Sequence, residues 1–246
     1  MSKTQIVILA AGQGKRLLPL TKVLPKTMLK VGGTPIIDHI LNSINLNLIN
    51  EIIIVVGHNK NAVMKHLKNN FKGIPIKYVD NSKHAETNST YSLWLARNLL
   101  KKKIVIINAD TIFHKKILEN LINSKYDAAL AIDDTIPIPL PDEAMKATIE
   151  NKKIVDVSKT ILPEKTNGDA IGIYKFSGKS LKVLINELDN LVSNSVTKQL
   201  FTYAVRNILN KVDIFSVSTE GRLWIEIDDQ NDLNIAQNLI KKILEN

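Results

Sequence analysis

The first half of the chain alternates apolar runs with segments in which apolar residues recur at helical spacing. The apolar runs are nearly continuous and have polar residues mainly at their ends, as expected of strands buried on both faces. They are 4–10 (TQIVILA), 51–57 (EIIIVVG), 103–110 (KIVIINAD) and 127–132 (DAALAI). The helical segments between them are 34–46, 59–71 and 89–102. Strands separated by helices of about 10–15 residues predict βαβ units and a parallel sheet.

The pattern changes after residue 134. Residues 135–143 (TIPIPLPDE) hold three prolines and are predicted to form a loop, and 145–159 is predicted to form a hairpin with its turn at 150–152. The remaining predicted strands are 169–177, 211–218 and 222–228, and the remaining predicted helices are 178–191, 195–210 and 229–244. We therefore predict an α/β fold with a Rossmann-like, mostly parallel twisted sheet flanked by helices. It forms one domain over 1–246, in which 1–134 is a nucleotide-binding core and 135–246 adds the acceptor-side elements and a closing helix.

Composition narrows the class of protein. The 246 residues are enough for one large α/β domain. The chain contains no cysteine, which excludes disulfides, thiolate metal sites and cysteine nucleophiles and fits a cytoplasmic protein. No apolar run reaches the length of about 18 residues that a membrane span needs, and the N-terminus lacks the pattern of a signal peptide. We expect no membrane insertion.

The formal net charge of +9 indicates an anionic partner or a general enrichment in lysine. The lysines are scattered, and aromatic residues make up only 5% of the chain. Nucleic-acid binding is therefore disfavoured, whereas phosphorylated small molecules remain candidates. The histidines are dispersed without a His-x-x-x-His pair, which disfavours a zinc site.

The loop after the first strand, GQGKRL (12–17), combines two glycines with two cations. Leu17 stands where a dinucleotide fingerprint has its third glycine, and the Gly-Lys-Ser/Thr of a P-loop is absent. Gly12 and Gly14 would let the backbone approach a polyphosphate, while Lys15 and Arg16 could neutralise it. A tight strand-to-helix turn with solvated cations is the alternative.

Residues 6–30 resemble the signature of the nucleotidyltransferases that make activated sugars and activated alcohol phosphates. The matching residues are Leu9-Ala10-Ala11-Gly12, Gly14, Arg16-Leu17, Pro19-Leu20-Thr21 and Pro25-Lys26. The resemblance continues at 31–39 (VGGTPIIDH), 108–110 (NAD) and 224–228 (WIEID). Within this superfamily it is closest to the phosphocholine and inositol-1-phosphate cytidylyltransferases, on Asn88, 90–96 and 221–236.

The resemblance implies that a nucleoside triphosphate, with CTP favoured, reacts with a phosphate monoester to give a nucleoside diphospho-alcohol and pyrophosphate. The acceptor phosphate is largely dianionic at neutral pH, because its second pKa is about 6, so no general base is required. Catalysis should then consist of positioning and electrostatic stabilisation, with Mg²⁺ as cofactor.

The resemblance also assigns roles to residues. Asp110 and Asp228 would hold the Mg²⁺, Arg16 would contact the β- and γ-phosphates, and Lys26 would bridge toward the reacting phosphate. The nucleotide-binding residues would further include Leu9, Ala10, Ala11, Gly12, Gly14 and Asn88. As alternatives, Asp110 could cap a helix over 111–122, Asp228 or Asp229 could cap the last helix, and Asn88 could cap helix 90–102.

Lys159, Glu226 and Trp224 are the candidates for acceptor binding. Lys159 matches a lysine that faces the acceptor phosphate in related transferases. Glu226 and Trp224 share a strand face with Asp228, so a carboxylate and an aromatic ring would lie along the acceptor. A surface lysine and a core tryptophan are the alternatives. Loop 135–143 and segment 158–170 should shape this pocket.

Two other functions stay open. One is a sugar-1-phosphate nucleotidyltransferase that uses UTP, dTTP or GTP. The other is a non-catalytic, nucleotide-binding regulatory protein, against which the joint presence of Arg16, Lys26, Asp110 and Asp228 argues. The acceptor is a small phosphorylated alcohol, amine or sugar. Homodimers are common among such enzymes, and the sequence leaves the oligomeric state open.

Overall fold

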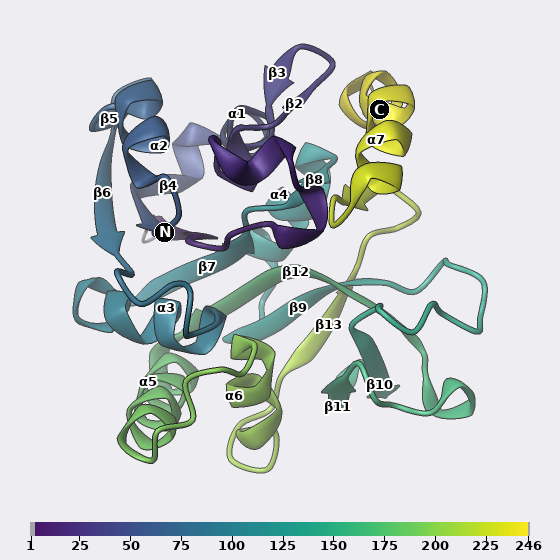
Figure 1. The fold of residues 1–246 in the computed structure, drawn as a ribbon. Helices are drawn as coiled ribbons and strands as arrows, with labels where there is room; N and C mark the ends of the chain where they lie inside the picture. Colours follow the sequence, from purple (N-terminus) through teal and green to yellow (C-terminus); the bar gives the residue numbers. More distant parts are fainter. Residues whose placement is uncertain (1–2, 246) are drawn as a thin grey trace.

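The computed structural model describes residues 3–245, which form a ten-stranded sheet flanked by seven α-helices (Figure 1). The strands of this sheet, in spatial order, are β10 (Lys146–Glu150), β11 (Lys153–Ser158), β13 (Phe215–Ser218), β9 (Ala128–Asp133), β12 (Gly168–Ser177), β7 (Lys103–Asn108), β1 (Thr4–Ala10), β4 (Ile49–Val56), β6 (Ile74–Asp80) and β5 (Asn70–Phe71). Two small ribbons pair β2 (Lys30–Val31) with β3 (Thr34–Pro35), and β8 (Thr111–Phe113) with β14 (Trp224–Glu226).

The helices cover both faces of the sheet. They are α1 (Ile36–Asn42), α2 (Lys60–Leu67), α3 (Ser89–Ala96), α4 (Lys115–Asn123), α5 (Gly178–Ser193), α6 (Phe201–Asn207) and α7 (Gln230–Glu245). Apolar residues of α1, α2, α4 and α7 share one buried cluster, and those of α3, α5 and α6 share the other. Figure 1 accordingly shows α1 and α7 above the sheet and α5 and α6 below it.

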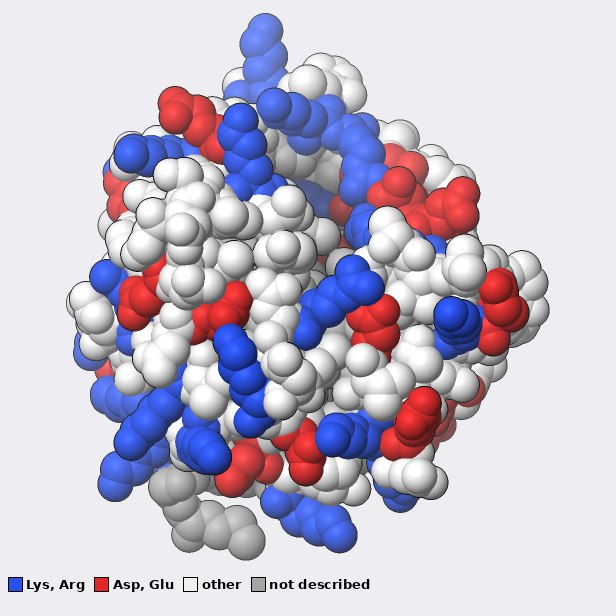
Figure 2. Space-filling model, turned by 90° about the horizontal axis from the view of Figure 1, so that it is seen from below, with Lys and Arg blue, Asp and Glu red and all other residues white. Residues whose placement is uncertain are grey.

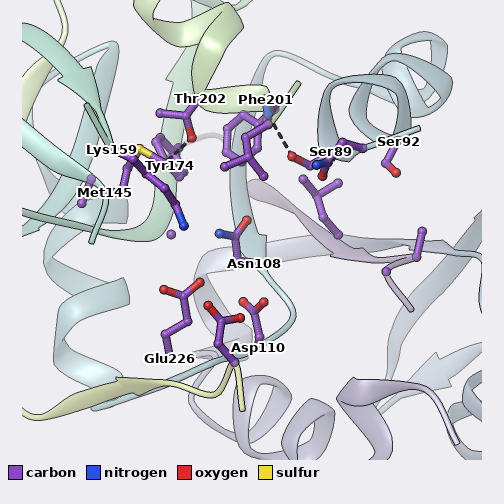
Figure 3. Close-up of a pocket in the computed structure, with 18 of the residues that line it drawn as sticks. Ser89, Ser92, Asn108, Asp110, Met145, Lys159, Tyr174, Phe201, Thr202 and Glu226 are labelled. Carbon is purple, nitrogen blue, oxygen red and sulfur yellow. Dashed lines mark hydrogen bonds between the residues drawn. The ribbon is translucent and has the colours of Figure 1, made fainter. Parts of the chain in front are cut away.

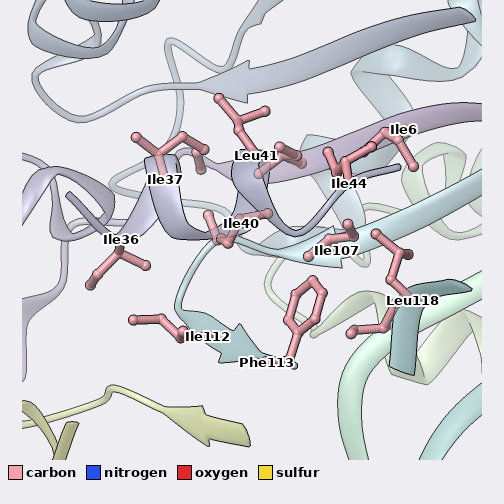
Figure 4. Packing of buried hydrophobic residues seen from close by; sticks show 14 of the residues in the cluster. Ile6, Ile36, Ile37, Ile40, Leu41, Ile44, Ile107, Ile112, Phe113 and Leu118 are labelled. Carbon is pink, nitrogen blue, oxygen red and sulfur yellow. The ribbon is translucent and has the colours of Figure 1, made fainter. Parts of the chain in front are cut away.

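Strand β1 supplies both clusters, because successive side chains of a strand point to opposite faces. Ile6 and Ile8 belong to the first cluster, and Val7 belongs to the second. The first cluster gathers the apolar side chains of α1 with Ile6 and Ile107 (Figure 4). The apolar runs of the sequence therefore form strands buried on both faces, as predicted.

The central strands β7, β1, β4 and β6 are parallel, in agreement with the predicted βαβ units. Leu9 near the end of β1 pairs with Asn108 at the end of β7. The loops that follow these strands therefore emerge side by side, at the carboxyl edge where open α/β sheets bind ligands.

The prediction of a mostly parallel sheet is wrong, because the sheet is mixed. Strand β12 lies antiparallel between β7 and β9, and the hairpin β10–β11 extends the sheet on the far side of β13. Hydrophobic periodicity reports that a strand is buried but not in which direction it runs. Strand β12 follows the hairpin β10–β11 and enters the sheet antiparallel to both of its neighbours, β7 and β9.

Several element boundaries also differ from the predictions. Helix 34–46 is shortened to α1, helix 195–210 to α6, and strand 222–228 to β14. The hairpin 145–159 forms as predicted, with Asn151 and Lys152 in left-handed backbone conformations at its turn.

None of the helices in residues 3–245 has both the length and the hydropathy of a membrane span. On the face shown in Figure 2, basic side chains are interleaved with acidic ones. The positive charge is spread over this face and not concentrated in one patch.

Candidate active site

The loop after β1 folds back on itself through Gly14. Its φ of 59° lies in the left-handed region, and a Cβ there would stand 3.0 Å from Lys26 Cβ and from Thr21 Cγ2. Thr21 Oγ1 donates a hydrogen bond to the Gly14 carbonyl at 2.8 Å. Only glycine fits this turn, which brings Lys26 back toward the end of β1.

Gly12 has a different role, since no described atom lies within 4 Å of a Cβ placed there. The open space belongs to a pocket of about 230 Å³ that Leu9, Ala11 and Gly12 line on one side. Ala10, Gly14 and Lys26 line the adjoining hollow. The predicted nucleotide-binding residues of this loop therefore lie together around two adjoining hollows.

Four charged side chains meet at the boundary between the two hollows. Lys26 Nζ lies 2.9 Å from Asp110 Oδ2 and 2.7 Å from Asp228 Oδ1. Arg16 Nη2 lies 2.6 Å from Asp228 Oδ2. The four residues are up to 212 positions apart in the sequence, and the structure brings them into one cluster of alternating charge.

Electrostatics keep these groups ionised despite their burial. Burial by itself would lower the pKa of Lys26, but Asp110 and Asp228 raise it above the usual value. Burial likewise opposes the charge of Asp228, and Lys26 and Arg16 outweigh it and lower the pKa of that carboxyl.

A third carboxylate, Glu226, lies beside this cluster. Oxygen atoms of Asp110, Glu226 and Asp228 all fall within 4.8 Å of one another. Burial, reinforced by the charges of Asp110 and Asp228, raises the pKa of Glu226 to about 8. The Oδ1 atom of Asp110 is buried without a hydrogen-bond partner among the described residues. Mg²⁺ prefers oxygen ligands such as carboxylates, and the Oδ1 atom of Asp110 is available to bind it. These residues therefore fit the ion.

The structure decides between the capping alternatives. Asp110 precedes the short strand β8, and the following helix α4 is capped by the side chain of His114, so the capping alternative for Asp110 is wrong. Asp229 Oδ1 accepts hydrogen bonds from the backbone amides of Asn231 and Asp232. Asp229 thus caps α7 and leaves the carboxylate of Asp228 to the charged cluster.

Asn88 lies at a position that serves both expectations, because it caps a helix and also lines the pocket. It is the N-cap of α3, where its Oδ1 accepts a hydrogen bond from the Ser89 amide at 2.8 Å, and it lines the pocket beside His84 and Ser92. Asn81, which is buried, donates to Ser92 Oγ at 3.0 Å and lines the same side. This side of the pocket is rich in hydroxyl and amide groups.

The opposite side of the pocket carries two of the three predicted acceptor residues. Lys159 and Glu226 both line it, and Figure 3 shows the ends of their side chains facing each other across this part of the cavity. Lys159 Nζ pairs with Glu143 Oε2 at 2.9 Å. Lys159 is therefore part of the pocket and not a separate surface lysine.

The expected position of Trp224 is wrong. Its side chain lies outside the described pocket lining, where it packs against the first buried cluster and donates from Nε1 to Asp133 Oδ2 at 2.7 Å. Strand β14 ends at Glu226, so the straight strand face assumed for 224–228 does not extend to Asp228.

Other residues of the acceptor side escaped the sequence analysis. The rings of Tyr174 and Phe201 meet edge to face at 4.6 Å and line the pocket, and Tyr174 forms a hydrogen bond with Thr202 (Figure 3). Asn108 also reaches the pocket, past Gly172, where an added Cβ would stand 2.8 Å from Asn108 Nδ2. Of these, only Asn108 had a sequence signal, because it belongs to the NAD motif.

Comparisons with known proteins identify the family to which the chain belongs. The chain is 30% identical over 96% of its length to the bifunctional protein GlmU of Methanococcus aeolicus, of which it spans 54%. It therefore covers about half the length of such relatives. It is 29% identical to the CTP:phosphoglutamine cytidylyltransferase of Campylobacter jejuni, over 93% of the chain and 97% of the relative. The choline-phosphate cytidylyltransferase of Streptococcus pneumoniae is 27% identical, over 96% and 97%.

The same fold occurs in the inositol-1-phosphate CTP transferase of T. maritima, with a TM-score of 0.80, 21% identity and coverage of 99% of this chain and 97% of that one. The profile of the nucleotidyl transferase family matches residues 5–224. The resemblance first noted in residues 6–30 is thereby confirmed for nearly the whole chain, which belongs to the nucleotidyl transferase family.

Proposed function

We propose that this protein transfers a nucleoside monophosphate, with CMP favoured, from a nucleoside triphosphate to a small phosphate monoester or phosphonate and releases pyrophosphate. The observation that carries the proposal is the cluster of Arg16, Lys26, Asp110 and Asp228 at the junction of two hollows. One hollow is bordered by the glycine loop, and the other extends toward Lys159 and Glu226.

The chain's own residues can bring two anionic reactants together. Arg16 and Lys26 supply positive charge for a triphosphate, and Gly12 leaves the space in which a phosphate can approach the backbone. A dianionic acceptor phosphate is already a nucleophile, so the pocket needs no general base. The contribution of the protein is then position and charge stabilisation.

Asp110 and Asp228, with Glu226 beside them, are the residues that would hold Mg²⁺. The ion would neutralise phosphate charge and stabilise the leaving pyrophosphate. Lys26 bridges both aspartates, so its ammonium lies within reach of any phosphate bound there.

The preference for CTP rests on relatives and not on a contact to the base. Two relatives that are matched over nearly their whole length are cytidylyltransferases, one for phosphoglutamine and one for choline phosphate. The acceptor side is consistent with a small acceptor: the rings of Tyr174 and Phe201, the hydroxyl of Thr202 and the carboxylate of Glu226 enclose it. With its pKa raised to about 8, Glu226 could form hydrogen bonds with hydroxyl groups as a neutral carboxyl, or pair with an ammonium group that favours its ionised form.

A sugar-1-phosphate acceptor with UTP, dTTP or GTP is the second candidate, because GlmU proteins match the chain over almost all of its length. A regulatory protein that binds a nucleotide without turnover is the third. These functions differ in product, so one assay separates them.

The test is pyrophosphate release by the purified protein with Mg²⁺, each of the four NTPs and a panel of acceptors. The panel contains phosphocholine, phosphoethanolamine, phosphoglutamine, aminoethylphosphonate, inositol-1-phosphate, glycerol phosphate and glucose-1-phosphate. We expect CTP with a non-sugar acceptor to give the highest kcat/KM. Preferred turnover of glucose-1-phosphate with UTP or dTTP would refute the small-acceptor assignment, and nucleotide binding without any turnover would favour the regulatory protein.

A further inference from the structure

Glu143 lies between two cations that the proposed function assigns to phosphates. Its Oε2 atom is 2.9 Å from Lys159 Nζ and 3.8 Å from Arg16 Nη1. The hydrogen bond from Lys159, together with the charges of Lys159 and Arg16, lowers the pKa of the Glu143 carboxyl. A carboxylate oxygen thus occupies a position between a lysine and an arginine that suits a phosphate oxygen equally well.

The backbone on both sides of this contact is anchored by one buried ammonium. Lys146, only 3% exposed, donates from Nζ to the carbonyls of Asp142 and Lys159, each at 3.0 Å. The Ala144 amide donates to the Pro141 carbonyl at 3.1 Å. The segments that carry Glu143 and Lys159 are therefore tied together independently of the side-chain ion pair.

The side chain of Glu143, in contrast, is 72% exposed. It can turn into solvent about its own side-chain bonds without a rearrangement of the anchored loop. Exposed ion pairs of this kind are individually weak, because solvent screens them. The contact can therefore hold the cations when no ligand is bound and still yield to a phosphate.

We propose that the Glu143 carboxylate is a built-in competitor for the substrate phosphate: it occupies Arg16 and Lys159 in the free protein and is displaced when phosphate binds. The inference rests on the proposed function in naming phosphate as the displacing group. Because the carboxylate occupies these cations in the free protein, only a fraction of the molecules has the open site, and the affinity of every anion that uses these cations is lowered by the same factor. Substitution of a residue that contacts the ligand directly would instead change the affinities of different anions by different factors.

The experiment measures binding and not turnover. Inorganic phosphate and methyl phosphate are titrated, without metal or nucleotide, into the wild-type protein, Glu143→Gln and Asp142→Asn, with ³¹P NMR shifts as the readout. Asp142→Asn is the matched control: it removes one negative charge from the neighbouring position, where the side chain is exposed and only the backbone carbonyl is bonded to Lys146.

We expect Glu143→Gln to tighten both anions by the same factor, about 3- to 10-fold, as the loss of two exposed ion pairs predicts. Asp142→Asn should stay within about twofold of the wild type, since its carboxylate lies outside the pairs with Arg16 and Lys159. An unchanged or weaker affinity in Glu143→Gln would overturn the inference. So would an equal gain in Asp142→Asn, or opposite changes for the two anions.

The outcome is separable from that of the proposed function. Tighter anion binding by Glu143→Gln in a protein that releases no pyrophosphate from any substrate pair would leave the competitor in place and remove only the transferase. Pyrophosphate release without the gain in affinity would support the transferase and overturn the role of Glu143 as a competitor.

Discussion

The side of the pocket that the proposed function assigns to the nucleotide comes largely from two segments of the first half of the chain, whereas the side proposed for the acceptor is assembled from segments scattered over the second half. Residues 9–27 supply the end of β1 and the loop that follows it, and residues 81–92 supply the loop before α3 and the start of that helix. The acceptor side takes Glu143 and Met145 from one loop, Lys159 from another, Tyr174 from β12, and Phe201 and Thr202 from α6.

This difference bears on how readily each side of the pocket tolerates substitution. A contiguous loop around a triphosphate is fixed by close backbone approach, so Gly12 and Gly14 have few substitutes. An acceptor wall built from side chains of separate elements can change one residue at a time while the sheet stays intact.

The charged cluster between the two sides should give the largest effect. Asp110→Asn and Asp228→Asn keep the side-chain volume but remove one charge, and we expect each to lower kcat at least about 100-fold because charge stabilisation of the transition state is lost. Pyrophosphate release at saturating Mg²⁺ measures this. Asp229→Asn is the matched control: asparagine caps helices as well as aspartate, so its kcat should stay near the wild-type value. Near-normal turnover of Asp228→Asn would show that the metal assignment is wrong.

Gly12→Val tests the nucleotide side alone. The added methyl groups would enter the open space beside the loop, so we expect titration calorimetry to detect no CTP binding, while the free energy of unfolding changes by no more than about 0.5 kcal/mol. Lys22→Ala, at an exposed lysine of the same loop that lies outside the lining of both hollows, is the comparison and should bind CTP almost normally. Equal CTP affinity in Gly12→Val and the wild type would contradict the phosphate cradle.

Lys159→Ala tests the acceptor side alone. We expect the KM for the acceptor to rise about 10-fold, because a charge-assisted contact is worth about 1.5 kcal/mol or more, with little change in the Kd of CTP. Lys165→Ala, also a loop lysine of this half but outside the pocket lining, serves as the control. A rise in the Kd of CTP of the same size would show that the two sides are not separable.

Trp224→Phe should have the smallest effect on turnover. The side chain lies outside the pocket lining, so kcat and KM should match the wild type. Loss of the hydrogen bond to Asp133 should lower the free energy of unfolding by about 1–3 kcal/mol, which thermal denaturation can measure. A large rise in the acceptor KM, with stability unchanged, would return Trp224 to the acceptor side.

The sequence by itself determined the parallel core and most of the nucleotide side. Continuous apolar runs can be satisfied only by strands buried on both faces, and a loop with fixed glycine and cation spacing keeps its local geometry wherever it occurs. The spacing of glycines and cations in the loop predicted Gly12, Gly14 and Arg16 as candidates for phosphate binding, and the resemblance to the nucleotidyltransferases added Lys26.

Tertiary structure alone decided three features of the molecule. They are the direction of β12, the position of Trp224 outside the pocket, and the presence of Tyr174, Phe201 and Glu143 in the pocket lining. Burial on both faces is compatible with either strand direction, and alternation along β14 predicts a face only as far as the strand continues, which is to Glu226. Contacts between residues far apart in the chain have no local signal, because they arise from the packing of whole elements and not from the spacing of residues along any one of them.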